Sequence, residues 1–450
     1  MKRTILLLLL LILLPKLSFA SSDITYIDVK VGKTYDIFER LDISSSEGLA
    51  LYPKNDLNSE ILIFDNYKVY VGKTFGLNDK LDIYNEEGQY ITSIPANGGV
   101  LIGPYPGSLS TIRVGQKEYR GYVGFVEDAS GMKVINHINI EDYLLGVVPR
   151  EIPSLSPPEA LKAQAVAARS YAYSSLNKHS KENYNLCDTT HCQVYGGFLD
   201  EKPTTNDAIL QTKDIVVKHQ GGVANTVFHS TSGGFTESSE NIWGSRLSYL
   251  VGKSDPYSLN SKNATWEFEV DKDLLYSRLN ENGYQIYKLN NIKIMETYAS
   301  GRVKSLLINE GEENLTISGE RFRSLIGTND LKSTLFTING LEIKNTSKDI
   351  YAIDKNQIYK VKDISILFDK SSTSYKEISS ISVIGKDNKI TKLLPSNISS
   401  DIDRIIISGK GYGHGVGMSQ YGAIDMAKQG FSYIDILSFY YSNIEVTKIN

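Results

Sequence analysis

Residues 146–175, "GVVPREIPSLSPPEALKAQAVAARSYAYSS", carry the strongest helix signal in the chain. An apolar run ends in a short segment with one acidic residue, Glu151, and an alanine-rich stretch follows. Ser156 and Glu159 have the spacing of a capping box, with Pro158 at the first helical position, so Glu159 is expected to be structural. Small apolar side chains then share one face, which lets the helix lie close to its neighbours: Leu161, Ala165, Ala168 and Ala172. We therefore expect a long helix with Glu151 in the loop before it.

Short runs typical of strands surround this helix. They cover residues 119–148 and return between about 264 and 404. We expect an α+β, β-rich fold with a mixed core, one long alanine-rich helix and C-terminal helices. A small β-repeat module precedes this core.

The β-repeat module is visible as an internal repeat. "VKVGKTYDIFERLDISSSEG" (29–48) aligns with "VYVGKTFGLNDKLDIYNEEG" (69–88) at an offset of 40 residues. Each copy alternates apolar and polar residues around turns that contain glycine, which is typical of strands and hairpins. Two copies are too few for a solenoid. The expected organisation has five parts: a signal peptide at 1–20, the β-repeat module at 22–112, the first part of the mixed core at 113–264, a β-rich region at 265–404 with an insertion at about 341–404, and the C-terminal part of the core at 405–450.

The N-terminus begins with Lys2 and Arg3, continues with an apolar run from Ile5 to Leu14, and reaches small residues at Ala20. This run is about half as long as a membrane-spanning helix, so it predicts a secretory signal cleaved after Ala20. We then expect a secreted protein. An uncleaved N-terminal membrane anchor is the alternative.

The charge of the chain argues against a nucleic-acid partner. Its formal net charge is −4, and no dense basic run is present. The alanine-rich helix offers only Lys162 and Arg169 as basic residues. We expect no nucleic acid to bind.

The two cysteines of the chain lie close together in "NLCDTTHCQVYGG" (185–197). Cys187, His191 and Cys192, together with His179, offer two thiolates and two imidazoles, which is a complete tetrahedral zinc set. A disulfide between Cys187 and Cys192 is the alternative, because export favours it and the close spacing allows it.

Two glycine-rich segments contain histidine: "FHSTSGGFTESS" (228–239) and "GKGYGHGVGMSQYGA" (409–423). Alternating glycines in the second segment predict an extended stretch with one bare face, to which something approaches closely. Neither segment has the helix-starting pattern of a phosphate-binding loop. Together with Glu151 and the cysteine segment, they predict a polar cleft.

At these residues the sequence resembles the stage II sporulation protein D family, which also includes amidase-enhancer proteins. The resemblance covers about 115–340 and 405–450, and rests on ordered blocks such as "IEDYLLGVVPREIP", "EALKAQAVAARSYA", "CDTTHCQVYGG", "HSTSGGFTESSENIWG" and "GKGYGHGVGMSQYGA". Ile152 stands where methionine is usual and Ser170 where threonine is usual. The β-repeat module and the insertion at 341–404 lie outside the resemblance.

The resemblance implies a peptidoglycan lytic transglycosylase that cuts glycan strands already stripped of stem peptides, with Glu151 as the catalytic glutamate. It also implies structural zinc on Cys187, His191 and Cys192, with His179 as the fourth ligand. The expected substrate-binding residues are Arg169, Gln193, Tyr195, His229, Ser230, Thr236, His414, Ser419 and Gln420.

Glycoside hydrolases ordinarily need two carboxylates, and Glu151 has no obvious carboxylate partner. One carboxyl suffices if the muramyl C6 hydroxyl of the substrate is the nucleophile. Two alternatives stay open. In the first, the protein is a non-enzymatic enhancer and partner of a cell-wall amidase; in the second, the zinc is catalytic, although four protein ligands leave no position for water.

Overall fold

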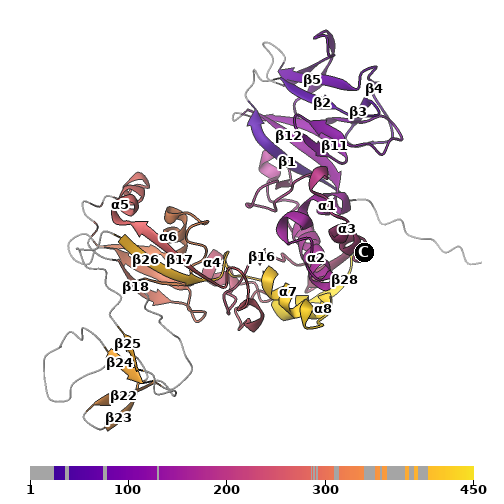
Figure 1. Ribbon diagram of the computed structural model, residues 1–450. Helices are drawn as coiled ribbons and strands as arrows, with labels where there is room; N and C mark the ends of the chain where they lie inside the picture. The colour runs from indigo at the N-terminus through magenta and orange to yellow at the C-terminus, as the bar shows by residue number, and fades with distance from the viewer. Residues whose placement is uncertain are drawn as a thin grey trace, which may run out of the picture.

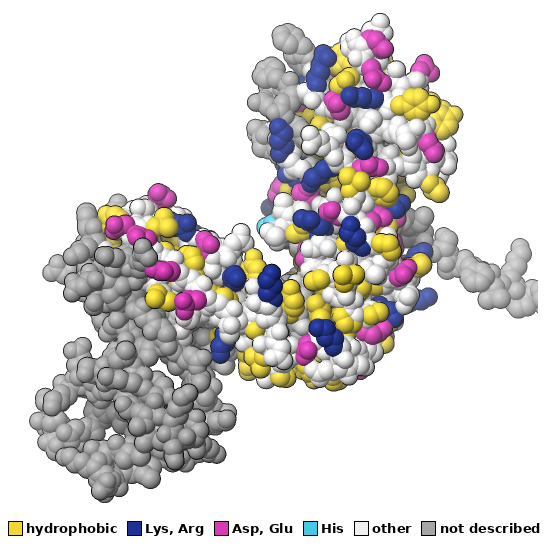
Figure 2. Space-filling model, in the orientation of Figure 1, with side chains coloured by type: hydrophobic (Ala, Val, Ile, Leu, Met, Phe, Trp, Pro, Cys, Tyr) yellow, Lys and Arg dark blue, Asp and Glu magenta, His cyan; other side chains and the backbone are white. Residues whose placement is uncertain are grey.

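The computed structural model describes residues 25–35, 40–73, 79–128, 131–284, 286, 289, 292–308, 314–338 and 404–449, together with four short strands between 350 and 393. The signal peptide expected at 1–20, and most of the insertion expected at 341–404, lie outside the described residues. Apart from the four short strands, the described residues form two lobes, as Figure 1 and Figure 2 show: residues 25–264 with 411–449, and residues 265–338 with 404–410. Both contain helices and strands, so the predicted α+β, β-rich class is confirmed.

Two sheets built from the N-terminal residues share one hydrophobic core. One sheet has the order β13-β1-β12-β11-β8-β3-β4 and the other β10-β9-β2-β5-β6-β7. The bounds of these strands are β1 Tyr26–Tyr35, β2 Leu41–Ser44, β3 Leu49–Pro53, β4 Leu62–Ile63, β5 Lys68–Lys73, β6 Lys80–Tyr84, β7 Tyr90–Pro95, β8 Val100–Pro104, β9 Ile112–Val114, β10 Lys117–Tyr119, β11 Tyr122–Asp128, β12 Gly131–Asn139 and β13 Leu186–Cys187.

The first strands of the two sequence repeats lie in different sheets, whereas their second strands, β2 and β6, lie in the same sheet. Val29 of the first repeat lies in β1, which pairs with β12, whereas Val69 of the second lies in β5, which pairs with β2. Both valines are fully buried. The boundary that the sequence predicts near residue 112 falls inside both sheets, because β9 pairs with β2 and β12 pairs with β1.

A helical layer adjoins these sheets and carries the alanine-rich helix at its centre (Figure 1). Its elements are α1 Ile140–Glu151, α2 Pro158–Ser174, α3 Pro203–Gln211, α7 Gln420–Lys428 and α8 Tyr433–Tyr440, with the strands β14 Ile215–His219, β15 Gly222–Val223 and β28 Glu445–Lys448. The helix α2 contacts α1, α3, α7, α8 and β14. Its small residues are buried on every side rather than on one face alone, which makes α2 the centre of the layer.

The capping box predicted at Ser156 is wrong. The residue before α2 is Pro157, and it makes no side-chain capping bond. Glu159 instead accepts a hydrogen bond from the backbone N–H of Tyr433 at 2.8 Å and pairs with Lys162 at 2.7 Å. Glu159 is thus structural as expected, but it joins α2 to α8 because the C-terminal helix lies across the start of α2.

The second lobe has its own hydrophobic core, which includes Trp266, Leu306, Phe322 and Ile407. Its sheets have the orders β17-β26-β21 and β18-β19-β20. The bounds are β17 Thr265–Asp271, α5 Lys272–Glu281, β18 Ile292–Thr297, β19 Val303–Ile308, β20 Leu315–Ser318, α6 Gly319–Ile326, β21 Phe336–Ile338 and β26 Arg404–Lys410. Hairpins of β22 Ile350–Asp354 with β23 Gln357–Val361, and of β24 Ile381–Ile384 with β25 Ile390–Leu393, fall in the predicted insertion. After β26 the chain returns to the first lobe through the glycine-rich segment.

None of the helices in the described part of the chain has the length and apolar character needed to cross a membrane.

Candidate functional site

A cleft of about 1350 Å³ opens beside Glu151. Tyr171 and Lys178, from the end of α2 and the segment after it, lie on its first-lobe side. Arg323 and Asn329, from α6 and the turn that follows, belong to the second lobe. The cleft therefore receives residues from both lobes, and its volume exceeds the roughly 300–1,000 Å³ of sites for small ligands. This size suits a segment of a polymer.

Glu151 is the last residue of α1, so the prediction of a loop position is wrong. The sequence pattern predicts strand-like runs up to residue 148 and a short loop after them, whereas residues 140–151 form this helix, with Pro149 inside it. Here α1 continues for two residues beyond Pro149, and the Ile152 N–H closes the end by donating to the Val148 carbonyl at 3.1 Å. The carboxyl group is thus fixed by a helix terminus.

The surroundings of Glu151 favour its protonated form. Burial raises the pKa of Glu151 above its ordinary value, although the N–H of Val194, the side chain of Gln420 and the charge of Arg150 act in the opposite direction. The Val194 N–H donates to Oε1 of Glu151 at 2.8 Å. The C-terminal end of a helix carries partial negative charge, which also disfavours the carboxylate. A carboxyl with a raised pKa is suited to give a proton at neutral pH.

The two histidine segments lie side by side next to this carboxyl. The strand β16 (Phe228–His229) pairs in parallel with β27 (Met418–Ser419). One residue, Val416, fixes both imidazole rings: its carbonyl accepts from His229 Nδ1 at 3.0 Å, and its N–H donates to His414 Nδ1 at 3.1 Å. His229 therefore carries its hydrogen on Nδ1, and its Nε2 is an acceptor.

Both histidines are neutral at neutral pH. Burial lowers the pKa of His229 well below its ordinary value and that of His414 to about 4, and the charge of Arg302 adds to both effects. His229 lines the cleft and is 4% exposed. Its Nε2 is buried without a hydrogen-bond partner in the described part of the protein. An unpaired buried acceptor is costly, and a donor from a bound ligand would satisfy it.

The glycine-rich segment 409–423 is not extended at its alternating glycines, which have φ between +72° and +110°. At each of these glycines, the absence of a side chain leaves room for another part of the same protein. A Cβ on Gly415 would lie 2.4 Å from the Arg302 guanidinium, and a Cβ on Gly417 would lie 2.1 Å from the Val227 carbonyl oxygen. The close approach that the sequence predicts thus comes from the protein's own chain.

The predicted substrate-binding residues divide into two groups. Residues that line the cleft are His229, Ser230, His414 and Gln420. Residues that are buried and bonded within the protein, outside the cleft lining, are Gln193, Tyr195, Thr236 and Ser419. Tyr195 donates its hydroxyl to Asn136 at 2.9 Å, and Ser419 caps α7. These four side chains stabilise the fold through bonds within the protein, so the prediction that they contact sugars is wrong.

Arg169 is also placed away from the cleft. It is fully buried, and its guanidinium makes two hydrogen bonds to the carboxylate of Glu141, at 2.6 and 2.7 Å. It also donates to the carbonyls of Ile215 and Ile209. The prediction of substrate binding is wrong for Arg169, because its donors already join α2 to α1, α3 and β14.

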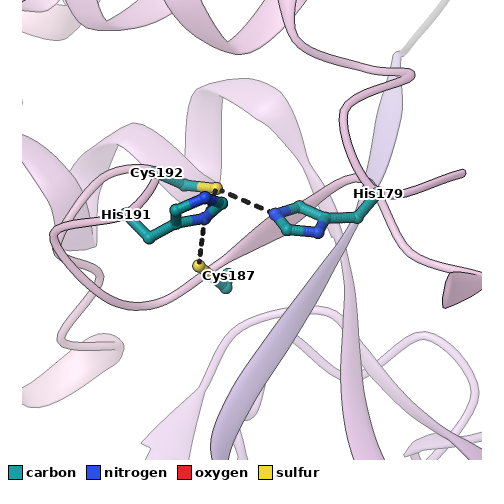
Figure 3. Close-up of side chains that lie close together, drawn as sticks. All are labelled: His179, Cys187, His191 and Cys192. Carbon is teal, nitrogen blue, oxygen red and sulfur yellow. Dashed lines mark hydrogen bonds between the residues drawn. The ribbon is translucent and has the colours of Figure 1, made fainter. Parts of the chain in front are cut away.

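The four predicted metal ligands come together, as Figure 3 shows. Their ligand atoms all lie within 4.8 Å of one another. The Nε2 of His179 lies 3.4 Å from the sulfur of Cys192, and the Nδ1 of His191 lies 3.8 and 3.7 Å from the two sulfurs. Both cysteines are free rather than joined in a disulfide. Two sulfur and two nitrogen donors in a small cluster fit tetrahedral zinc.

The surroundings of His179 also suit a metal ligand. Its second ring nitrogen, Nδ1, lies 3.2 Å from a carboxylate oxygen of Glu182. Such a bond from the ring nitrogen that faces away from the metal is what fixes the orientation of a ligating histidine. The same loop continues from Cys192 to Val194, whose N–H binds Glu151. The cluster therefore lies in the same loop as Val194, whose N–H holds the carboxyl of Glu151.

Several cleft residues were not predicted from the sequence. Trp243, at the end of α4 (Ser239–Trp243), is 48% exposed and its ring lies 5.2 Å from that of His414. Tyr171, Lys178 and Arg323 also line the cleft. Trp243 stands in the block "HSTSGGFTESSENIWG", just after the histidine segment, so a tryptophan at that place was the available signal. Lys178 and Arg323 gave no signal, because basic residues in these segments resemble ordinary surface residues.

Fold and site together define a mixed α+β protein with an interlobe cleft built around a single buried carboxylic acid. The family model described as "Stage II sporulation protein" matches residues 128–219. The chain is 32% identical to an amidase enhancer of Bacillus subtilis over 68% of its length, but it spans only 40% of that relative. It is 30% identical to an uncharacterised protein of Brachyspira hyodysenteriae, over 74% of this chain and 73% of that one, and 26% identical to stage II sporulation protein D of Bacillus subtilis, over 70% and 76%.

The chain belongs to the stage II sporulation protein D family. This membership and the amidase-enhancer relative support a cell-wall-related role.

Proposed function

We propose that this protein is an exported peptidoglycan lytic transglycosylase. It cleaves the bond between N-acetylmuramic acid and N-acetylglucosamine in peptide-stripped glycan strands and leaves a 1,6-anhydro-muramyl end. The observation that carries the proposal is the buried carboxyl of Glu151, whose pKa is raised, at the wall of a polymer-sized cleft.

The composition of the cleft supports a mechanism with one carboxyl. Glu151 is the only carboxylate among the described residues that line it. An inverting or retaining hydrolase would need a second carboxyl within about 10 Å to activate water or attack the sugar. An intramolecular attack by a substrate hydroxyl removes this need.

The reaction then has two proton transfers through one side chain. Protonated Glu151 gives its proton to the glycosidic oxygen as the bond from C1 of the muramyl sugar to that oxygen breaks. The C6 hydroxyl of the same sugar attacks C1, and the Glu151 carboxylate accepts the hydroxyl proton. The products are an N-acetylglucosamine hydroxyl end and the anhydro ring, and Glu151 returns to its protonated state without water entering.

The rest of the cleft offers contacts suited to a glycan. The Nε2 of His229 accepts a hydrogen bond from a sugar hydroxyl or acetamide N–H, because its own ring hydrogen is already engaged. The half-exposed ring of Trp243 offers an apolar face to a sugar ring. The neutrality of His229 keeps its acceptor lone pair available at neutral pH.

Zinc is proposed as a structural partner, held by His179, Cys187, His191 and Cys192. Bound zinc would crosslink the loop and supply no open position for water, because all four ligands come from the protein. Its contribution to the reaction is to hold the loop that continues to Val194.

A second candidate function is enhancement of a cell-wall amidase, favoured by the name of the Bacillus subtilis relative. Here the cleft would recognise glycan or amidase without cutting. Both candidates are tested by incubating the wild type and Glu151→Gln with peptide-free strands, with peptide-bearing strands, and with a purified wall amidase. The lytic proposal predicts anhydro-muramyl fragments from peptide-free strands with the wild type alone. Amidase stimulation that survives in Glu151→Gln, with no fragments from either protein, would select the enhancer.

A further inference from the structure

The charged side chains around the cleft are mostly cations. Arg150, Lys178 and Arg323 line it, and Glu151 is the only carboxylate among the described lining residues. The formal charge of the whole chain is −4. The cleft thus concentrates positive charge in an acidic protein, and such a cleft attracts anionic ligands.

Lys178 is held at the first-lobe wall without a carboxylate partner among the described residues. Its Nζ donates to the hydroxyl of Tyr171 at 3.0 Å and to the backbone carbonyl of His191 at 2.6 Å, and the Cys192 side chain is a further neighbour. Within the described residues, no carboxylate lies at ion-pair distance from Lys178. An ammonium group held in place without a carboxylate keeps its attraction for a ligand's negative charge.

Arg323 is held at the second-lobe wall by a backbone carbonyl and by a long ion pair with Glu320. It is 8% exposed, and its Nε donates to the Leu331 carbonyl at 2.9 Å. The carboxylate of Glu320 lies 3.8 Å from Nη1, which is beyond hydrogen-bond distance. A guanidinium of this kind is suited to bind a carboxylate with two parallel hydrogen bonds.

Arg150 differs from Lys178, which is also exposed, because its guanidinium already lies 3.5 Å from the carboxylate of Asp200. Unlike the buried Arg323, its side chain is half exposed, so salt screens its attraction for an anion. Arg150 is therefore the weakest of the three candidates for recognition of an anion. The two fixed cations lie on different lobes, one on each side of the cleft.

We infer that Lys178 and Arg323 bind free carboxylates of an acidic glycan and thereby select strands whose muramyl groups carry no peptide. This inference rests on the proposed function. Each muramyl sugar bears a lactyl group that ends in a carboxylate when the stem peptide is absent. Attachment of the peptide converts that carboxylate into a neutral amide at the same position. In a glycan strand every second sugar bears one lactyl group. Lys178 and Arg323, which lie on different lobes, therefore bind carboxylates of different sugars in the same strand.

The test measures binding and does not require cleavage. The Glu151→Gln protein is titrated calorimetrically with a peptide-free glycan oligomer and with the same oligomer whose lactyl carboxylates are converted to carboxamides. The carboxylate form is expected to bind at least about tenfold more tightly, or about 1.4 kcal/mol. Lys178→Gln and Arg323→Gln, each made in the Glu151→Gln protein, should reduce this ratio, whereas Lys181→Gln, an exposed lysine outside the cleft lining, should not.

Equal affinity for the two oligomers would overturn the inference, as would an equal loss of affinity for both in Lys178→Gln. A phosphate-rich wall polymer that competes more strongly than the carboxylate oligomer would also overturn it, because the cations would then serve a different anion. Arg323→Lys keeps the charge and should keep most of the preference, so the test stands if Arg323→Gln fails to fold. Failure of the proposed lytic reaction would be seen separately, as absence of cleavage by the wild type with the binding preference intact.

Discussion

The backbone N–H of Val194 donates to Oε1 of Glu151 across 2.8 Å, which joins the end of α1 to the loop that carries His191 and Cys192. Val194 follows Cys192 by two residues. The position of the proposed catalytic carboxyl therefore depends on how firmly this loop is held. Four predictions follow from the site, and each separates a structural from a chemical role.

Zinc should stabilise the protein and order the Val194 loop. At free zinc one hundred times the dissociation constant, a site that exists only in the folded state adds about 2.7 kcal/mol. Elemental analysis should find one zinc per chain, and a chelator should lower the melting temperature and speed hydrogen exchange at the Val194 amide. Cys192→Ser should behave like the chelated wild type. A metal-free purified protein whose melting temperature is indifferent to zinc would contradict the prediction.

Glu151→Gln should be more stable than the wild type at neutral pH. Because burial raises the folded pKa of Glu151, the folded state binds more protons than the unfolded state between the ordinary pKa and the raised one. This carboxyl therefore lowers the free energy of unfolding as pH rises through that window, and above the window the penalty is complete. Urea unfolding across pH should show a stability gain of the variant that disappears below the ordinary pKa of glutamate. A constant difference at all pH values would contradict the assigned pKa direction.

Arg169→Met should destabilise the fold without changing glycan affinity. The substitution leaves the Glu141 carboxylate without its two hydrogen bonds from Arg169. The free energy of unfolding should fall by ~3 kcal/mol, which is the low end for a broken buried ion pair. The low end applies because the Glu141 side chain is partly exposed. Urea unfolding gives the stability and calorimetry the affinity, with Arg169→Lys as the partial rescue that keeps the charge. A stable Arg169→Met protein that no longer binds glycan would contradict this prediction, because it would show that Arg169 contributes to substrate binding.

His229→Phe should weaken substrate binding because it removes the unpartnered Nε2 acceptor. The expected effect is a rise in KM of about fivefold or more, since a hydrogen bond of this kind contributes about 1 kcal/mol. His414→Phe is the matched control: its Nδ1 is already occupied by the Val416 N–H, so its loss should lower stability more than affinity. Unchanged KM in a folded His229→Phe protein would show that the acceptor does not meet the substrate.

The sequence predicted the parts of this fold that repeat a local pattern. The alanine-rich segment became α2, because small side chains at Ala165, Ala168 and Ala172 allow close contact on every side. Glu151 and the four candidate metal ligands could be singled out from the sequence because their residue types carry chemistry. Burial of the cluster and the distances within it depend on the loop's path, which no local pattern gives.

The remaining errors have a common physical origin in long-range contacts. Arg169 looked like a basic residue free for a ligand, but Glu141, 28 positions earlier, takes its guanidinium. Glu159 has capping spacing, yet its partner is the backbone of Tyr433, 274 positions later. Trp243 was missed because exposure at a cleft wall is set by neighbours distant in sequence.

The most direct test of the central claim is mass spectrometry of the fragments formed from peptide-free glycan in water enriched in heavy oxygen. If Glu151 both gives and takes the proton while the muramyl C6 hydroxyl attacks, wild-type fragments will end in an anhydro ring with no heavy oxygen, and Glu151→Gln will form none. Fragments with reducing ends that carry the heavy label would show hydrolysis by water and would contradict the account.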